Sequence, residues 1–115
     1  MNLTSRDENG WLVVQVAESR IDAACAIHFK ETMRRITDTG AGPVILDLGA
    51  VDFVDSSGLG AVVAVMKHLG HARPLHLAGL MPNVDRVFRL TRMDSIFPIH
   101  ADLTDALSTL ADDVR

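Results

Sequence analysis

Cysteine and long apolar runs are scarce in this sequence. Cys25 is the single cysteine, so an internal disulfide is excluded and a reducing compartment is the simpler interpretation. The first residues, Met1–Asp7, contain no apolar signal segment, and no run approaches the roughly 20 apolar residues that cross a bilayer. We therefore expect a cytoplasmic protein with no membrane insertion.

An excess of positive charge is also missing. The formal net charge is −4 over 115 residues, whereas a nucleic-acid binder normally has a clustered basic face. The local basic groupings, Arg34-Arg35 and the trio Arg86, Arg89 and Arg92, are interpreted as solvent-facing helix positions. Nearly half of the residues are apolar, which predicts one globular domain over residues 1–115.

The most informative stretch runs from Val44 to Leu69. It begins with a strand-like apolar run, Val44–Leu48, and turns at the hexapeptide Asp55–Gly60. The spacing of apolar residues predicts a helix from Leu59 to about Leu69, with Ser57 as its N-cap. The two adjacent hydroxyls of Ser56 and Ser57 are thus predicted at a helix N-terminus, where free N–H groups and the helix dipole favour an anion.

A hairpin is predicted before this stretch. Asn9-Gly10 suits the positive backbone angles of a tight turn, so Leu3–Arg6 is expected to pair as an edge strand with Trp11–Ala17. The polar segment Ser19–Asp22 is interpreted as a break before a helix, with Asp22 as the N-cap. The apolar stripe of that helix consists of Ala26, Phe29, Met33 and Ile36.

Strands and helices alternate in the second half as well. Leu75–Leu80 is predicted to be a strand, and Pro82 falls where a helix could begin. Ile96–Ile99 is the last predicted strand, and Asp102 is expected to cap a terminal helix. This order predicts an α/β fold with a mixed, mostly parallel sheet and about four helices.

Two segments carry a resemblance to a known family. Val44–Leu48 and Val51–Gly60, the latter with the Asp-Ser-Ser-Gly-Leu-Gly hexapeptide, resemble the central motif of STAS domains. Within that family they look most like the bacterial anti-sigma factor antagonists. The Asn9-Gly10 hairpin and the closing helix fall in family order. One difference is Ser19, where the family usually has glycine.

The resemblance implies a partner switch rather than an enzyme, and it implies no cofactor. Such proteins bind an anti-sigma factor that is also a serine kinase of the GHKL type, and so free a sigma factor. The kinase phosphorylates the first serine of the motif, which falls on Ser56 here. The phosphorylated form then dissociates until a serine phosphatase restores it.

The expected partner surface surrounds Ser56. A partner that binds this surface already accommodates the acidic residues near Ser56. Phosphorylation would add further negative charge there, and like charges across an interface are costly. Small residues on the following helix would let a partner approach the backbone closely. The candidate partner-binding residues are Asp22, Asp55, Ser57, Gly58, Gly60, Ala61 and Ala64.

The family leaves a second hypothesis open. Stressosome scaffolds and accessory subunits of lipid or anion transport systems also contain STAS domains. The second hypothesis is therefore that this chain is a scaffold or accessory subunit that is never phosphorylated. Such members often vary the serine motif, whereas this chain retains it intact. The intact motif favours the regulatory interpretation.

Other chemistry lacks its required residues. A serine hydrolase elbow needs Gly-x-Ser-x-Gly, and no glycine precedes either serine by two positions. A P-loop is unsupported because Gly-Lys-Ser/Thr is absent. A phospho-aspartate receiver needs an acidic cluster after its first strand, where this chain has only Glu18. His68 and His71 stand three apart, but two ligands without partners make a poor zinc site.

Overall fold

The computed structural model describes residues 1–113, with side chains to Thr109. After an initial hairpin, the strands of the main sheet alternate with helices, as expected, and the short strands Arg20–Ile21 and Phe53–Val54 form a separate two-stranded sheet. The strands are β1 Leu3–Glu8, β2 Trp11–Val16, β3 Arg20–Ile21, β4 Val44–Asp47, β5 Phe53–Val54, β6 Leu75–Ala78 and β7 Ile99–His100. The helices are α1 Ala26–Thr37, α2 Ser56–Leu69, α3 Pro82–Leu90, the short 3-10 helix η1 Met93–Ser95, and α4 Leu103–Asp113.

Five strands form the main sheet in the order β1-β2-β4-β6-β7. β1 is antiparallel to β2, and the pairs β2–β4, β4–β6 and β6–β7 are parallel. The predicted mixed, mostly parallel sheet is therefore confirmed. The predicted hairpin is also present, with Asn9 and Gly10 at φ angles of 53° and 86°, and β1 extends two residues beyond Arg6.

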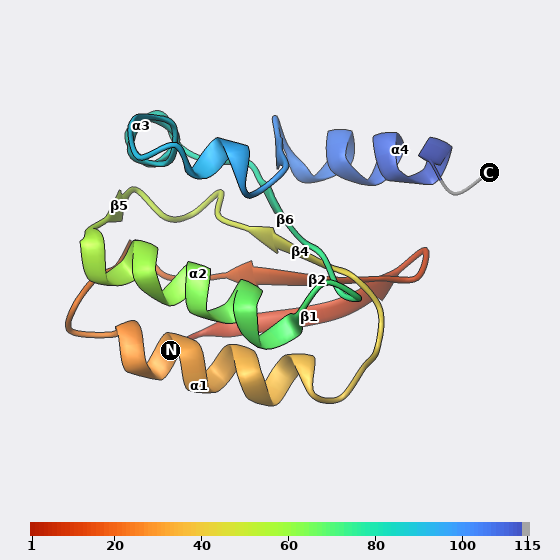
Figure 1. Ribbon diagram of the computed structural model, residues 1–115, viewed down its shortest axis with the longest axis horizontal. Helices are drawn as coiled ribbons and strands as arrows, with labels where there is room; N and C mark the ends of the chain where they lie inside the picture. Colours follow the sequence, from red (N-terminus) through yellow and green to blue (C-terminus); the bar gives the residue numbers. More distant parts are fainter. Residues whose placement is uncertain (114–115) are drawn as a thin grey trace.

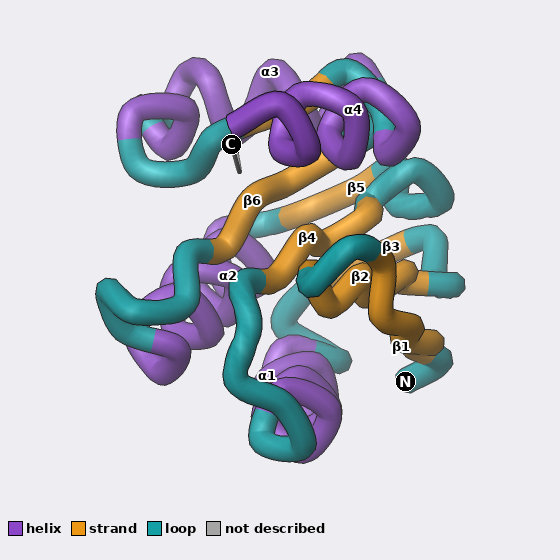
Figure 2. Tube along the Cα trace, turned by 90° about the vertical axis from the view of Figure 1, so that its right-hand side faces the viewer, coloured by secondary structure: helices purple, strands orange, loops and turns teal. Residues whose placement is uncertain are grey.

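Helices cover both faces of the sheet (Figure 1). α1 and α2 lie on one side, and α3 and α4 lie on the other, as Figure 2 shows from the perpendicular direction. Alternation along the strands explains this arrangement. Val14 and Leu46 face the core that α1 and α2 complete, whereas Val13 and Ile45 pack with Ala106 of α4.

The segment before α1 differs from expectation. Arg20 and Ile21 form β3, which pairs in parallel with β5, instead of a polar break. The prediction of Asp22 as the N-cap is wrong, because α1 begins at Ala26 and its N-cap position is Cys25. Asp22 instead accepts a hydrogen bond at Oδ1 from the N–H of Ala24 at 3.1 Å, so it orders the turn that leads into the helix.

The last strand is displaced from its predicted position. The chain first forms η1, and β7 then pairs with β6 at Ile99–His100. Pro98 has no N–H to donate to a ladder, and its carbonyl accepts a hydrogen bond from the N–H of Leu77 at the point where the pairing starts. Asp102 caps α4 as predicted, accepting at Oδ1 from the N–H of Asp105 at 2.7 Å. None of the helices in the described part of the chain is long and apolar enough to cross a bilayer.

Candidate functional site

The junction between β5 and α2 is organised by Asp55. Its Oδ1 accepts a hydrogen bond from the N–H of Gly58 at 2.8 Å, which makes Asp55 the N-cap of α2. The helix therefore begins at Ser56, and the prediction of Ser57 as the N-cap is wrong. Aspartate is as good a cap as serine, and here its position at the end of β5 decides between them. Both serines consequently lie in the first turn of the helix.

The two serine side chains are exposed to solvent. In the part of the chain that the structure describes, neither the Ser56 nor the Ser57 hydroxyl makes a hydrogen bond. An incoming enzyme can therefore reach either oxygen without breaking an internal contact. A phosphate on Ser56 would lie at the positive end of the α2 dipole, near N–H groups that no helical carbonyl can satisfy.

Close backbone approach fixes the first turn of α2 against β3. A Cβ built on Gly58 would meet the carbonyl oxygen of Ile21 at 1.9 Å, a separation no real side chain tolerates. Gly58 is accordingly buried. Gly58 was predicted to be a partner-binding residue, and in this structure its role is in packing. It lets the helix start directly beside β3, and it lies beneath the surface that a partner could contact.

The segment from β3 to α1 borders the serines from the other side. The N–H of Ala23 donates to Oδ2 of Asp55 at 3.0 Å, so one carboxylate joins this segment to the start of α2. Asp22 pairs through Oδ2 with the guanidinium Nε of Arg20 at 3.0 Å. That hydrogen bond lowers the pKa of Asp22, with smaller help from Cys25 and the N–H of Ala24, and the carboxylate is ionised at neutral pH.

Ser19, where the family usually has glycine, needs no unusual backbone. It is not among the positive-φ residues of the described chain, and its carbonyl accepts a hydrogen bond from the N–H of Asp52 at 2.9 Å. The turn before β3 therefore forms with serine at this position.

The small residues of α2 divide between core and surface. Gly60 is exposed and Ala64 is partly exposed, so both remain available to a partner. Ala61 is only 3% exposed and packs in the core. The prediction that Ala61 contacts a partner directly therefore does not fit the structure, because its side chain is buried in the core.

Two apolar side chains near this surface were not among the predicted site residues. Phe53 is 40% exposed, and the guanidinium of Arg20 lies 4.2 Å from its ring centroid. Ile27 is 64% exposed on α1. A signal for Ile27 was available, because it falls outside the apolar stripe at Ala26, Phe29 and Met33. Phe53 has no comparable signal, since β5 is too short for alternation to be read.

Metal binding has no support in the described residues, among which no group of three or more potential ligands gathers. His68, one of the two histidines considered above, has its Nε2 3.2 Å from Oδ1 of Asp38. This contact joins the C-terminal ends of α1 and α2.

Comparison with known proteins identifies the family. A model of the STAS domain family matches residues 2–106. BtrV of Bordetella bronchiseptica, described as an anti-sigma factor antagonist, is 33% identical over 100 residues, which cover 86% of this chain and 85% of BtrV. The anti-sigma-F factor antagonist RsfB of Mycobacterium tuberculosis is 28% identical over 103 residues, 78% of this chain and 80% of RsfB.

A solved structure agrees with both sequence relatives. The crystal structure of an anti-sigma factor antagonist from Mycobacterium paratuberculosis superposes with a TM-score of 0.82 at 28% identity, over 94% of this chain and 92% of that one. The family match spans most of the chain, and the fold and the serine motif agree with it. The chain belongs to the STAS domain family, and the relatives compared above are described as anti-sigma factor antagonists.

Proposed function

We propose that this protein is an anti-sigma factor antagonist that acts in the cytoplasm through a phosphorylation-controlled partner switch. The unphosphorylated form binds an anti-sigma factor that is also a GHKL-type serine kinase, and so frees a sigma factor. Phosphorylation of Ser56 releases the partner, and a serine phosphatase reverses the modification. The protein itself acts by binding, without catalysis.

One observation carries the proposal: the Ser56 hydroxyl is exposed and lacks an internal hydrogen bond. No general base within the described residues hydrogen-bonds to it, so its surroundings suit modification by another enzyme better than nucleophilic catalysis. The description of the relatives BtrV and RsfB as anti-sigma factor antagonists gives independent support. The intact motif favours this function over a constitutive scaffold or transport subunit.

The charges around Ser56 supply a physical mechanism for release. The carboxylate of Asp55 caps α2, and that of Asp22 lies on the neighbouring segment between β3 and α1. A partner that fits this surface must accommodate both. Phosphate adds about −1.5 to −2 charges. Like-charge placement across an interface costs several kcal/mol, and about 3 kcal/mol corresponds to roughly a 100-fold weaker complex.

The proposed contact surface consists of the predicted partner-binding residues that are accessible to solvent around Ser56. Gly58 and Ala61 are buried beneath this surface and support it through packing. The surface residues are Asp22, Asp55, Ser56, Ser57, Gly60 and Ala64.

The test uses the purified protein and the GHKL-type anti-sigma factors encoded in its own genome. Each is incubated with ATP and with the wild type, Ser56→Ala or Ser57→Ala, and phosphate is located by peptide mass spectrometry. We expect phosphate on Ser56 in the wild type and in Ser57→Ala, and none in Ser56→Ala. The phosphorylated protein should bind the same partner about 100-fold more weakly.

Three results would contradict the proposal. They are phosphate on Ser57 in place of Ser56, equal partner affinity of the two forms, and the absence of phosphate on protein from native cells across growth and stress conditions. The last result would favour the scaffold or accessory-subunit function.

A further inference from the structure

A groove runs between α1 and α2 on the outer side of the molecule. Its hollow, about 330 Å³, is lined by Ile27, Lys30, Glu31 and Arg34 of α1 and by Ala64 of α2. Because Ala64 has a small side chain, the α2 side of the groove is shallow and the hollow stays open. A smaller hollow of about 50 Å³ continues beside it to His68.

The helices on either side of the groove are joined at both ends. At its first end, the N–H of Ala23 is bonded to Asp55, the cap of α2. At its other end, Asp38 and His68 join the helix C-termini. The two helices therefore run side by side in the same direction, as Figure 1 also shows. Ser56 is the first residue of α2, and Ala64 in the groove lining lies about two turns further along the same helix.

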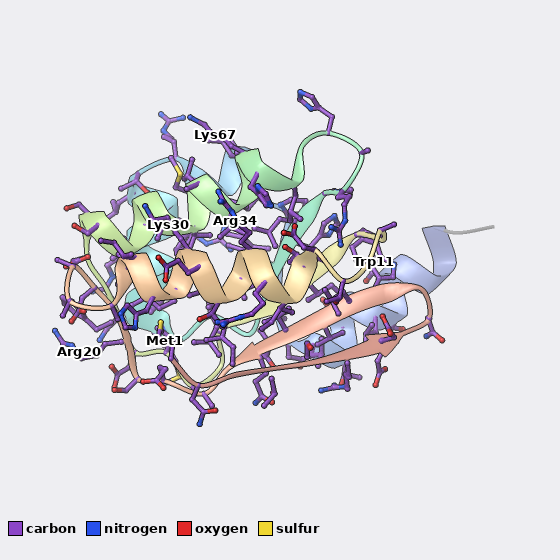
Figure 3. All side chains as sticks on the ribbon, turned by 90° about the horizontal axis from the view of Figure 1, so that it is seen from below. Met1, Trp11, Arg20, Lys30, Arg34 and Lys67 are labelled. Carbon is purple, nitrogen blue, oxygen red and sulfur yellow. The ribbon has the colours of Figure 1, made fainter. Side chains whose placement is uncertain are left out.

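Unpaired positive charge distinguishes this groove. Lys30 and Arg34 are exposed, and in the described part of the chain neither forms an ion pair. Figure 3 shows both side chains rising from α1 on the side where α2 lies. Glu31 is the one carboxylate in the lining. The chain as a whole carries a formal charge of −4. The groove, with two cations and one carboxylate in its lining, has a net positive charge instead.

An apolar contact accompanies the charge. Ile27 is one turn before Lys30 and Glu31, and 64% of its surface is exposed. It lies in the same lining as Ala64. An apolar side chain placed between Ile27 and Ala64 would remove both from water, while acidic side chains one turn further along would meet Lys30 and Arg34. This pattern fits an amphipathic acidic segment.

We propose that the α1–α2 groove binds an acidic segment of the protein partner, with carboxylates at Lys30 and Arg34 and an apolar side chain between Ile27 and Ala64. The inference rests on the proposed function, because it assigns this segment to the anti-sigma factor that contacts Ser56. The groove contributes affinity and orientation, whereas Ser56 controls release.

The test measures the affinity of the unphosphorylated protein for the purified anti-sigma factor that phosphorylates it. Lys30→Glu/Arg34→Glu reverses the charge of the groove. The matched control is Arg35→Glu/Arg86→Glu, which changes the net charge equally at exposed positions outside the groove lining. We expect the groove variant to bind at least about tenfold more weakly, and the control to stay within about twofold of the wild type.

Two further measurements keep the result specific. The neutral variant Lys30→Gln/Arg34→Gln should lose affinity to an intermediate degree and show a shallower dependence on salt than the wild type. Circular dichroism should show each variant folded.

The possible failures are distinguishable. Wild-type affinity in the groove variant, with Ser56-dependent release retained, would overturn the groove assignment and leave the proposed function intact. Equal losses in the groove variant and the control would also overturn it, because net charge alone would then explain the effect. If no GHKL-type anti-sigma factor binds the wild type, both proposals are wrong.

Discussion

The carboxylate of Asp55 accepts a hydrogen bond at 3.0 Å from the backbone N–H of Ala23, 32 residues earlier in the chain. Its other oxygen caps α2 through Gly58. A single side chain therefore joins the turn before α1 to the first turn of α2, which contains the two exposed serines. The geometry of the proposed contact surface depends on this carboxylate.

Two substitutions of Asp55 separate its two hydrogen bonds. Asp55→Ala removes the helix cap and should lower the free energy of unfolding by about 1 kcal/mol. Asp55→Asn keeps a capping oxygen for Gly58 but offers no second acceptor to Ala23, so it should lose less stability. Urea denaturation measures both. Equal losses in the two variants would show that the cap contributes nothing beyond the bond to Ala23.

Gly58→Ala should be one of the most destabilising alanine substitutions in α2. The added Cβ would collide with the carbonyl oxygen of Ile21, and overpacking of this kind costs about 1–3 kcal/mol. The matched control is Gly60→Ala, where a Cβ meets no atom within 4 Å. Because alanine favours a helix interior, this control should gain up to about 1 kcal/mol. Urea unfolding of the pair checks the prediction, and a stabilised Gly58→Ala protein would contradict it.

Phosphorylation of Ser56 should leave the fold intact. A phosphate at the N-terminus of α2 interacts favourably with the helix dipole by about 0.3–1 kcal/mol, and the nearby carboxylates of Asp22 and Asp55 offset part of this. We expect the unfolding free energy of the phosphorylated protein to equal or slightly exceed that of the unmodified protein, with any gain reduced by salt. A loss above about 1 kcal/mol would imply that release follows from local unfolding.

The Arg20–Asp22 pair predicts a pH dependence. The hydrogen bond from Arg20 lowers the pKa of Asp22 in the folded protein below its unfolded value of about 3.9. The folded state is therefore favoured above that unfolded value, and this contribution is lost as the pH falls through the lowered pKa. Asp22→Asn should lose less stability than the wild type between about pH 5 and about pH 3.

The control for this measurement is Asp7→Asn. The side chain of Asp7 is exposed and makes no hydrogen bond or ion pair within the described residues. Its pH profile should follow the wild type. If Asp22→Asn also follows the wild type over this range, the pair contributes nothing to stability in acid.

Local signals predicted the long elements well. The Asn9-Gly10 turn carries its own conformational requirement, and φ angles of 53° and 86° meet it. The apolar run Val44–Leu46 and the helical spacing of the apolar residues in α1 are both visible in the order of the residues. These features are decided within a few residues, so the sequence is sufficient to predict them.

Features that depend on distant partners escaped prediction. β3 and β5 contain two residues each and exist because they pair with one another across 31 intervening residues. Asp55, Ser56 and Ser57 are all good N-caps, and the choice among them follows from where β5 ends. The burial of Gly58 and Ala61 follows from the approach of α2 to β3 and the sheet, which no local pattern encodes.

The free hydroxyl of Ser56 has a consequence for how such a signal could be observed. Since that oxygen holds no internal contact, phosphate can be added or removed without any rearrangement elsewhere in the domain. The isolated protein would then have the same secondary structure in its phosphorylated and unphosphorylated forms. Only the affinity for a second molecule that contacts the start of α2 would differ between the two forms. The signal would therefore be measurable in the complex and not in the fold of the isolated protein.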